Sequence, residues 1–237
     1  MNPAVAPSPL AVDLAIFTVT EADLKVLLVR RQAPPFKDAW SLPGDAVDLG
    51  DMGRRPGEHL GSAARRILET STGLPSQPGQ LQQFQAFGRS ERDPRGRVVT
   101  VAWLARVSPD FAPMVALRRG VDWFSVNDEV PWMRLALDHA EILAAATLHL
   151  QQQSADTQTL LALVPATFTV SDLQAAESAV LERPSDTRAF RRRFDRWVSE
   201  GLIARAPGKR HMGRARPAQV WRATCRIPGQ SPFQDAG

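Results

Sequence analysis

The pattern of apolar residues changes near residue 150, and this change restricts the chain to two folds of different kinds. Before it, apolar runs rich in β-branched residues predict strands at 11–19, 24–30, 81–88, 97–107 and 121–125. Helical spacing lies among these runs, at 58–72 and 137–152. After it come short helical patterns at 157–163, 171–181 and 186–200, and then strand-like runs at 202–206 and 219–223. Ser171 and Asp186 are the expected N-caps of the second and third of these helices, and Gly201 is the expected end of the third. The first order indicates an α+β domain with a mixed sheet, and the second is the order of a winged helix.

A polar stretch, 151–156 (QQQSAD), is the expected boundary between these two folds. A length of 237 residues suits two domains, each able to bury its own core. We therefore expect one domain over 1–152, a second over 153–227 and a frayed tail over 228–237.

Composition argues against membrane and secreted proteins. No apolar run approaches the roughly 18 residues that a membrane-spanning helix needs. The N-terminal stretch MNPAVAPSPL lacks the basic and apolar regions of a signal peptide. The chain has one cysteine, Cys225, which leaves no partner for a disulfide. We expect a cytoplasmic protein without membrane contacts.

Positive charge is concentrated in the second domain. The whole chain carries a net charge of +4, but residues 183–222 hold twelve Lys or Arg and three acids. The remainder of the chain is therefore acidic. A basic segment on an acidic body predicts a polyanionic partner, although a solvated charged face explains most single basic runs.

The helix predicted at 186–200 has an apolar stripe and a basic outer face. Helical spacing predicts a buried stripe of Phe190, Phe194, Trp197 and Val198. The remaining surface is rich in arginine, with Arg188, Arg192 and Arg196 opposite the stripe and Arg191 and Arg193 beside it. Such a face suits a groove that is lined by phosphates.

A second basic stretch lies between the two strands predicted at 202–206 and 219–223, where a wing would reach neighbouring phosphates. It contains Lys209, Arg210, His211, Arg214 and Arg216. These residues, together with Arg188, Arg191, Arg192 and Arg196, form the predicted DNA-binding set. The alternative is a charged solvated helix beside a flexible loop.

A spaced motif covers residues 40–74. WSLPG at 40–44 is followed by Glu58, then by seven residues, then by RILETSTGL at 66–74. This arrangement resembles the Nudix signature, which reads Gly, five residues, Glu, seven residues, Arg-Glu-hydrophobic-any-Glu-Glu-any-Gly-hydrophobic. The spacing from Glu58 to Arg66 and the Gly73-Leu74 ending both match. The alternative is an amphipathic helix that simply ends at a glycine.

The motif departs from that signature at the positions that bind metal. The second glycine of the usual Pro-Gly-Gly is Asp45, and the loop from there to Glu58 is longer than the signature allows. The helix glutamates are replaced by Ile67, Thr70 and Ser71. Positions i, i+3 and i+4 share one helix face, where three carboxylates could hold a divalent cation on a pyrophosphate. Since magnesium needs anionic oxygen ligands, we expect no metal, no cofactor and no catalytic residue there.

A pocket can still bind a ligand after its catalytic groups are lost. The turn segment 89–97 is rich in arginine and suits bidentate contacts with phosphate, and 30–36 (RRQAPPF) could form a second wall. The predicted effector-binding residues are Arg30, Phe36, Trp40, Glu58, Arg66, Arg89, Arg92 and Arg95. By the resemblance, Glu58 and Arg66 mainly brace the loop against the helix. The alternatives are a solvated hairpin for 89–97 and a plain strand exit for 30–36.

A wider resemblance covers nearly the whole chain. It is carried by QAPPFKDAWSLPG (32–44), RDPRGRVVTVAWLA (92–105), LDHAEIL (137–143), FRRRF (190–194) and KRHMGRARPAQVWR (209–222). In these segments the sequence resembles the NrtR family, Nudix-related transcriptional regulators of NAD metabolism. The resemblance implies a homodimeric repressor. Its Nudix-like α/β/α sandwich would sense ADP-ribose or a related nucleotide sugar, and its winged helix would bind a palindromic DNA operator.

Two other functions stay open. One is a Nudix hydrolase of ADP-ribose or other nucleoside diphosphate derivatives that uses acids outside the signature, with Asp48, Asp51, Glu58 and Glu91 as the nearby candidates. The other is a nucleotide-binding adaptor that touches no DNA. The concentration of arginine in the second domain argues against the adaptor, and the replaced glutamates argue against the hydrolase.

Overall fold

The computed structural model describes residues 9–51, 55–74, 76, 80–130, 133–210 and 217–224 of the chain. The first part of the chain forms a mixed sheet. Its strands are β1 (Leu10–Thr20), β2 (Asp23–Arg30), β3 (Trp40–Ser41), β4 (Gly44–Ala46), β7 (Leu81–Phe87), β8 (Val99–Arg106) and β9 (Val121–Ser125). The order is β3-β2-β1-β8-β7, while β4 pairs with β1 and β9 with β2. β1 and β8 are parallel, and the other pairs are antiparallel. The predicted mixed sheet is confirmed.

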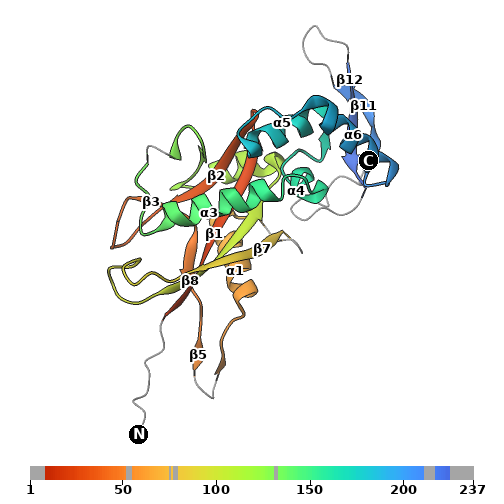
Figure 1. Cartoon of the computed structure of the whole chain (residues 1–237). Helices are drawn as coiled ribbons and strands as arrows, with labels where there is room; N and C mark the ends of the chain where they lie inside the picture. The colour runs from red at the N-terminus through yellow and green to blue at the C-terminus, as the bar shows by residue number, and fades with distance from the viewer. Residues whose placement is uncertain are drawn as a thin grey trace.

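Strand β1 supplies side chains to a separate apolar core on each face of the sheet. On one face, helix α1 (Leu60–Thr72) packs against Val12, Leu14 and Ile16. On the other face, helix α3 (His139–Gln152) packs against a cluster that contains Ala15, Phe17 and Val19. Because successive strand residues point to opposite faces, a continuous apolar run serves both cores. The result is an α/β/α sandwich (Figure 1).

Shorter elements complete this part. β5 (Gly50–Asp51) and β6 (Arg55–Pro56) pair antiparallel inside the long segment that follows WSLPG. The 3-10 helix η1 (Pro109–Phe111) and helix α2 (Ala112–Ala116) lead into β9. Within the described residues, no helix has both the length and the apolar character needed to cross a bilayer.

The second part consists of three helices and a small sheet. The helices are α4 (Thr157–Leu161), α5 (Val170–Leu181) and α6 (Thr187–Ser199), and they are followed by β11 (Ile203–Arg210) and β12 (Ala218–Ala223). A short strand that the sequence does not predict, β10 (Thr167–Phe168), pairs with β12. The predicted winged helix is confirmed, and it occupies the end of the molecule away from the N-terminus (Figure 1).

The observed N-cap of α6 is the predicted residue, whereas the observed N-cap of α5 is not. Asp186 accepts a backbone N–H and caps α6, as predicted. For α5 the prediction of Ser171 is wrong, because the cap is Thr169: its hydroxyl accepts the N–H of Asp172, whose carboxylate accepts the N–H of Thr169. This reciprocal pair satisfies two N–H groups at once, so the helix begins before Ser171. Gly201, with φ of 75°, follows the end of α6 as expected.

The two parts share one apolar core. The cluster on the α3 face of the sheet continues through Leu160 and Leu163 to the buried residues of the winged helix, Phe168, Leu173, Phe190 and Phe194. At the predicted boundary between the two parts, the last residue of β8 is hydrogen-bonded to the segment that leads into the second part. Arg106 donates to Gln153 Oε1 at 3.2 Å and to Thr159 Oγ1 at 3.1 Å. The segment between α3 and α4 is therefore held against the sheet.

Candidate functional site

A cavity of about 900 Å³ lies between the start of β1, the end of β2 and the segment 92–98. We call it the main cavity. Its ionisable lining consists of five arginines, three aspartates and one histidine: Arg30, Arg31, Arg92, Arg95, Arg97, Asp13, Asp45, Asp93 and His139. Its volume is in the range of small-molecule sites, and its excess of arginine suits an anionic ligand.

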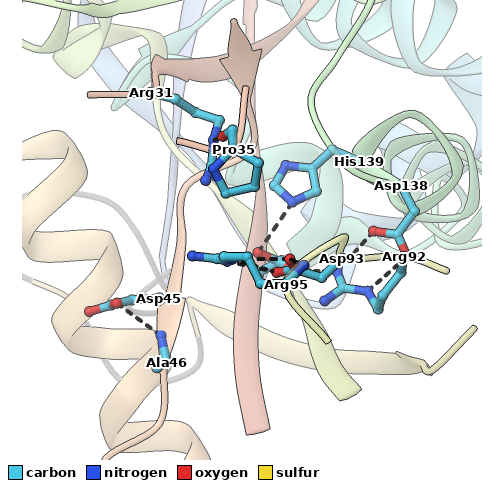
Figure 2. A network of polar contacts seen from close by, with 10 residues as sticks. Arg31, Pro35, Asp45, Ala46, Arg92, Asp93, Arg95, Asp138 and His139 are labelled. Atoms are coloured by element: carbon cyan, nitrogen blue, oxygen red, sulfur yellow. Dashed lines mark hydrogen bonds and ion pairs between the residues drawn. The ribbon is translucent and has the colours of Figure 1, made fainter. Parts of the chain in front are cut away.

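Arg92 is a buried cation at the base of the main cavity. Its side chain is 2% exposed and lies 3.1 Å from Asp13 Oδ2 and 2.8 Å from Asp138 Oδ1. Its Nε also donates to Asp138 Oδ2 at 2.9 Å, so the contact with Asp138 is bidentate (Figure 2). Since a buried charge is tolerated only when it is paired and hydrogen-bonded, this network fixes the start of β1 to the start of α3.

His139 is a buried neutral side chain in the same network. The N–H of Leu42 donates to its Nδ1 at 2.9 Å, so in the neutral ring the proton is on Nε2. Nε2 lies 3.6 Å from Asp13 Oδ1, too far for a hydrogen bond, and has no hydrogen-bond partner among the described residues (Figure 2). Burial lowers the pKa of His139 despite the attraction of Asp13 and Asp138. The ring is therefore an N–H donor at the cavity wall.

Gly44, the last residue of the WSLPG stretch, is required by this network. A Cβ added at Gly44 would lie 1.9 Å from Asp13 Oδ1. β4 pairs with β1 so that Gly44 stands directly beside Asp13. A larger residue would displace the Asp13 carboxylate, and with it a partner of Arg92.

Arg31 and Arg95 bring like charges together at the mouth of the main cavity. Arg31 donates through Nε to the carbonyl of Pro35 at 2.9 Å. Burial, and after it the charge of Arg95, lowers the pKa of Arg31. Arg95 in turn pairs with Asp93 at 2.6 Å, and this contact lowers the pKa of the Asp93 carboxyl (Figure 2). An anion bound here would offset the repulsion between the two guanidinium groups.

The first half of the Nudix-like motif forms a brace at the N-terminal end of α1. Arg66 lies 2.7 Å from Glu58 Oε1 and 2.6 Å from Asp45 Oδ2. Glu58 Oε1 also accepts the N–H of Asp48 at 2.9 Å. Hydrogen bonds from Arg66 lower the pKa of Glu58, and Glu58 raises the pKa of Arg66. As the resemblance implies, Glu58 and Arg66 tie the long loop to the helix.

In the second half of the motif, the three residues that stand in place of the signature glutamates have different environments. Ile67 is 2% exposed and belongs to the core between α1 and the sheet. Thr70 donates its hydroxyl to the carbonyl of Arg66 at 2.9 Å, and Ser71 lies half-buried beside it. Among the described residues, no group of three or more His, Cys, Asp or Glu side chains is placed to hold a metal ion.

The eight predicted effector residues fall into three places. Arg30, Arg92 and Arg95 line the main cavity, and Glu58 and Arg66 form the brace. Three others lie elsewhere: Phe36 is exposed, Trp40 packs edge-on against Phe124 at 4.8 Å, and Arg89 pairs on the surface with Glu141 at 3.0 Å.

The main cavity also contains residues that the sequence does not single out. Two of them, Asp13 and His139, are buried ionisable residues. An acid inside the apolar run 11–19 is a signal that could have identified Asp13, because such an acid needs a buried partner. His139 has no comparable signal, since it begins a helix of ordinary pattern.

The outer face of α6 carries the exposed arginines that were predicted for DNA. Arg188, Arg191, Arg192 and Arg196 are exposed, while Phe190, Phe194 and Trp197 are buried. Arg191 lies 3.3 Å from Asp195 and Arg196 lies 3.8 Å from Glu200, both at spacing i,i+4. Within the described chain, Arg188 and Arg192 have no ion pair. This face is available to a phosphate backbone.

Two arginines of the second part form ion pairs within the fold. Arg193 pairs with the buried Glu177 of α5, so it joins the two helices of the helix-turn-helix. Arg210, which was predicted to contact DNA, donates to Asp172 at 2.6 Å and to the carbonyl of Thr167 at 2.9 Å. Lys209 beside it is exposed. The predicted wing residues His211, Arg214 and Arg216 lie outside the described residues.

Known protein families match both parts of the chain. The NUDIX domain family matches residues 9–146, and the NrtR DNA-binding winged helix domain matches residues 160–223. The ADPR responsive transcriptional repressor NtrR of Acinetobacter baylyi is 32% identical over 218 residues, which are 91% of this chain and 82% of that protein. An ADP-ribose pyrophosphatase of Methanocaldococcus jannaschii is 28% identical over 130 residues, 55% of this chain and 70% of that protein.

A solved structure shares the whole arrangement. The crystal structure of Shewanella oneidensis NrtR complexed with a 27mer DNA is 31% identical, with a TM-score of 0.77, and covers 90% of this chain and 93% of that one. The match to the A. baylyi repressor likewise extends over both domains. We conclude that this chain belongs to the NrtR family, in which a Nudix domain is joined to a DNA-binding winged helix domain.

Proposed function

We propose that the protein is a homodimeric transcriptional repressor whose winged helix binds a palindromic operator and whose Nudix domain binds ADP-ribose or a related nucleotide sugar in the main cavity. Ligand binding releases the DNA by favouring a dimer conformation in which the two α6 helices no longer fit successive major grooves. The observation that carries the proposal is the exposed arginine face of α6 on a domain of the NrtR DNA-binding type.

The arrangement of α5 and α6 supports the DNA-binding part of this proposal. The ion pair between Arg193 and the buried Glu177 holds α6 against α5, so the opposite side of α6 faces outward. That side presents Arg188 and Arg192 without an acidic partner among the described residues. Lys209 extends the positive charge to the end of β11. Basic side chains on the helix surface and at the end of β11 suit contacts with DNA phosphates.

The position of α3 supports the coupling of the two domains. This helix begins at Asp138 and His139, which belong to the main cavity network, and it ends at Gln152 beside the hydrogen bonds of Arg106 to the second part. A ligand that changes the Arg92–Asp138 contact therefore acts on a helix that reaches the DNA-binding domain. This gives the two sites a shared structural element, which coupling requires.

A gel-shift experiment with the DNA upstream of the protein's own gene tests the proposal. We expect a specific complex at moderate salt, and we expect ADP-ribose to reduce it in a concentration-dependent way. Arg95→Ala, which removes a guanidinium from the cavity mouth, should raise the ADP-ribose concentration needed. Arg65→Ala, an exposed arginine of α1 outside the cavity lining, is the matched control. The absence of any specific complex would overturn the proposal.

We further propose that the Nudix domain binds its ligand without hydrolysing it. Ile67 is buried in the apolar core between α1 and the sheet, and Thr70 and Ser71 have no negative charge with which to bind magnesium. Glu58, which was considered as a substitute acid, is occupied by Arg66 and by the N–H of Asp48.

The likeness to an ADP-ribose pyrophosphatase favours hydrolysis as the second candidate function. Incubation of the protein with ADP-ribose and magnesium or manganese separates the two. We expect no AMP or ribose 5-phosphate. Release of these products by the native chain, with loss of that release in Glu58→Gln, would establish a hydrolase instead.

A further inference from the structure

A second cavity, of about 760 Å³, lies beside the C-terminal half of α1, and its lining is basic. Three arginines line it, Arg30, Arg118 and Arg119, and no acid does. Thr70 and Ser71 also line it. We call it the arginine pocket. It therefore faces two of the three positions where the Nudix signature has glutamates.

The arginines are brought together by the backbone. The N–H of Arg30, at the end of β2, donates to the carbonyl of Gly120 at 2.7 Å and ties the turn that carries Arg118 and Arg119 to the sheet. Gly120 has φ of 73°, which favours glycine in this turn. The two arginines of the turn are thus held next to the strand end that carries the third.

Arg118 is positioned against α1 itself. Its Nη2 donates to the carbonyl of Thr70 at 2.7 Å. A Cβ added at Gly73 would lie 2.6 Å from its Nη1, so the glycine that ends the helix also leaves room for the guanidinium. Since helix C-termini carry unsatisfied carbonyls and partial negative charge, Arg118 has a structural role as well. Arg118 also lines the arginine pocket.

The charge of the arginine pocket is not compensated within the described chain. Arg30 donates through Nε to the carbonyl of Asp38 at 3.1 Å, a contact that adds no negative charge. No ion pair joins Arg30, Arg118 or Arg119 to a carboxylate of any described residue. All three side chains are exposed. Guanidinium groups that converge without an acidic partner are the arrangement that binds phosphate oxygens.

We propose that the arginine pocket binds a phosphate or diphosphate group directly, with no metal ion between the ligand and the protein. In a Nudix signature, carboxylates on α1 would hold a cation, and the cation would hold the phosphate. Here the helix supplies uncharged hydroxyls and the facing turn supplies the cations. The two cavities share Val29, Arg30 and Gln32. A diphosphate in the arginine pocket can therefore belong to a nucleotide whose other end occupies the main cavity, or to a separate ligand.

Calorimetric titration of the full chain with inorganic pyrophosphate in EDTA tests this inference. We expect saturable binding by the native chain. Arg119→Ala is the informative variant, because the structure gives its side chain no hydrogen bond or ion pair among the described residues, and it should weaken binding by about tenfold. Arg65→Ala should bind as the native chain does. The double variant Thr70→Glu with Ser71→Glu places two acids in the pocket, and it should weaken binding in EDTA at least as much as Arg119→Ala does.

Three results would overturn the inference: no binding in EDTA, binding that needs magnesium, or equal binding by the native chain and Arg119→Ala. Thermal unfolding of each variant shows whether it is folded. Titration with ADP-ribose then identifies the source of the phosphate. If ADP-ribose competes with pyrophosphate and also binds more weakly to Arg119→Ala, the phosphate in the pocket belongs to the nucleotide. If ADP-ribose and pyrophosphate bind independently, the pocket takes a separate ligand. The inference depends on the proposed function only for that assignment, because a negative gel shift leaves the pyrophosphate result unchanged.

Discussion

Arg92 at the base of the main cavity and the arginines on the outer face of α6 are held in opposite ways. In the cavity, Arg92 is 2% exposed and contacts two carboxylates, those of Asp13 and Asp138. On α6, Arg188 and Arg192 are exposed and have no carboxylate partner within the described chain. Arginine in the first setting stabilises the fold, and arginine in the second is available to a ligand. The distinction depends on the acids nearby rather than on the arginine itself.

Energetics explain why the two settings differ. A buried ion pair contributes little net stability relative to an apolar replacement, but removal of one partner leaves a buried charge uncompensated. An exposed arginine loses little on truncation, because water solvates the charge in both the folded and the unfolded state. The same substitution to alanine should therefore have large effects on folding in one region and small effects in the other.

The largest effect is expected for Arg92→Ala. This change leaves the carboxylates of Asp13 and Asp138 buried without their cation, and we expect the free energy of unfolding to fall by about 3–5 kcal/mol. Denaturation in urea, followed by circular dichroism, measures it. The control is Arg89→Ala, whose exposed pair with Glu141 should contribute less than about 1 kcal/mol. Equal losses in the two variants would remove the distinction between the regions.

A smaller loss of stability is expected for Arg193→Ala, on α6 itself. Glu177 is buried, and without Arg193 it retains the hydroxyl of Ser185 as a partner. The guanidinium also lies 5.6 Å from the ring centroid of Phe190. We expect the free energy of unfolding to fall by about 1–3 kcal/mol, the cost of a buried acceptor that loses its partner. The apparent DNA affinity of this variant should fall only in proportion to its fraction of folded protein. A loss of affinity with unchanged stability would place Arg193 among the DNA contacts.

The sequence predicts the architecture well because periodicity reports burial. The run 11–19 is apolar at every position but two, and it becomes a strand buried on both faces. Of the predicted stripe, Phe190, Phe194 and Trp197 are buried and Val198 is half-buried. The Nudix-like motif likewise locates α1 and its brace, because it specifies the spacing of Glu58 and Arg66 in the chain.

The sequence predicts the roles of single arginines poorly. Arg92 and Arg95 lie three residues apart in one turn, but only Arg92 is buried, since only it reaches Asp13 on β1 and Asp138 before α3. Those partners are distant in the chain, and no local pattern encodes them. Arg192 and Arg193 are adjacent, and only the fold places Glu177 beside the second of them.

A pH effect is expected from the neutral ring inside the cavity network. The pKa of His139 is lowered by burial, whereas the same group in the unfolded chain titrates near 6.5. Below about pH 6.5 the unfolded chain therefore binds a proton that the folded chain does not, so stability is present above this pH and is lost as the pH falls. The loss is at most about 1.4 kcal/mol for each pH unit. After burial, the charges of Asp13 and Asp138 oppose this lowering of the pKa, and those of Arg92 and Arg31 add to it.

Urea denaturation at pH 7.5, 6.5 and 5.5 measures this effect. His139→Gln should show a weaker pH dependence than the native chain, because glutamine retains an acceptor for the N–H of Leu42 and does not titrate. His59→Gln is the control, since His59 is exposed at the start of α1. A pH dependence that is unchanged in His139→Gln would show that other groups of the network, and not the ring, determine it.

The smallest effect on stability, and the clearest effect on the proposed function, is expected for Arg192→Ala. Its side chain is exposed on α6, so the free energy of unfolding should stay within about 0.5 kcal/mol of the native value. If Arg192 contacts a phosphate, DNA binding weakens for every sequence alike, and the slope of log K against log salt becomes smaller by about 1. Fluorescence anisotropy at several salt concentrations measures the slope. Arg65→Ala, on α1 of the Nudix domain, should leave the slope unchanged. An unchanged slope in Arg192→Ala would mean that an exposed, unpaired arginine on α6 is not sufficient to identify a DNA contact.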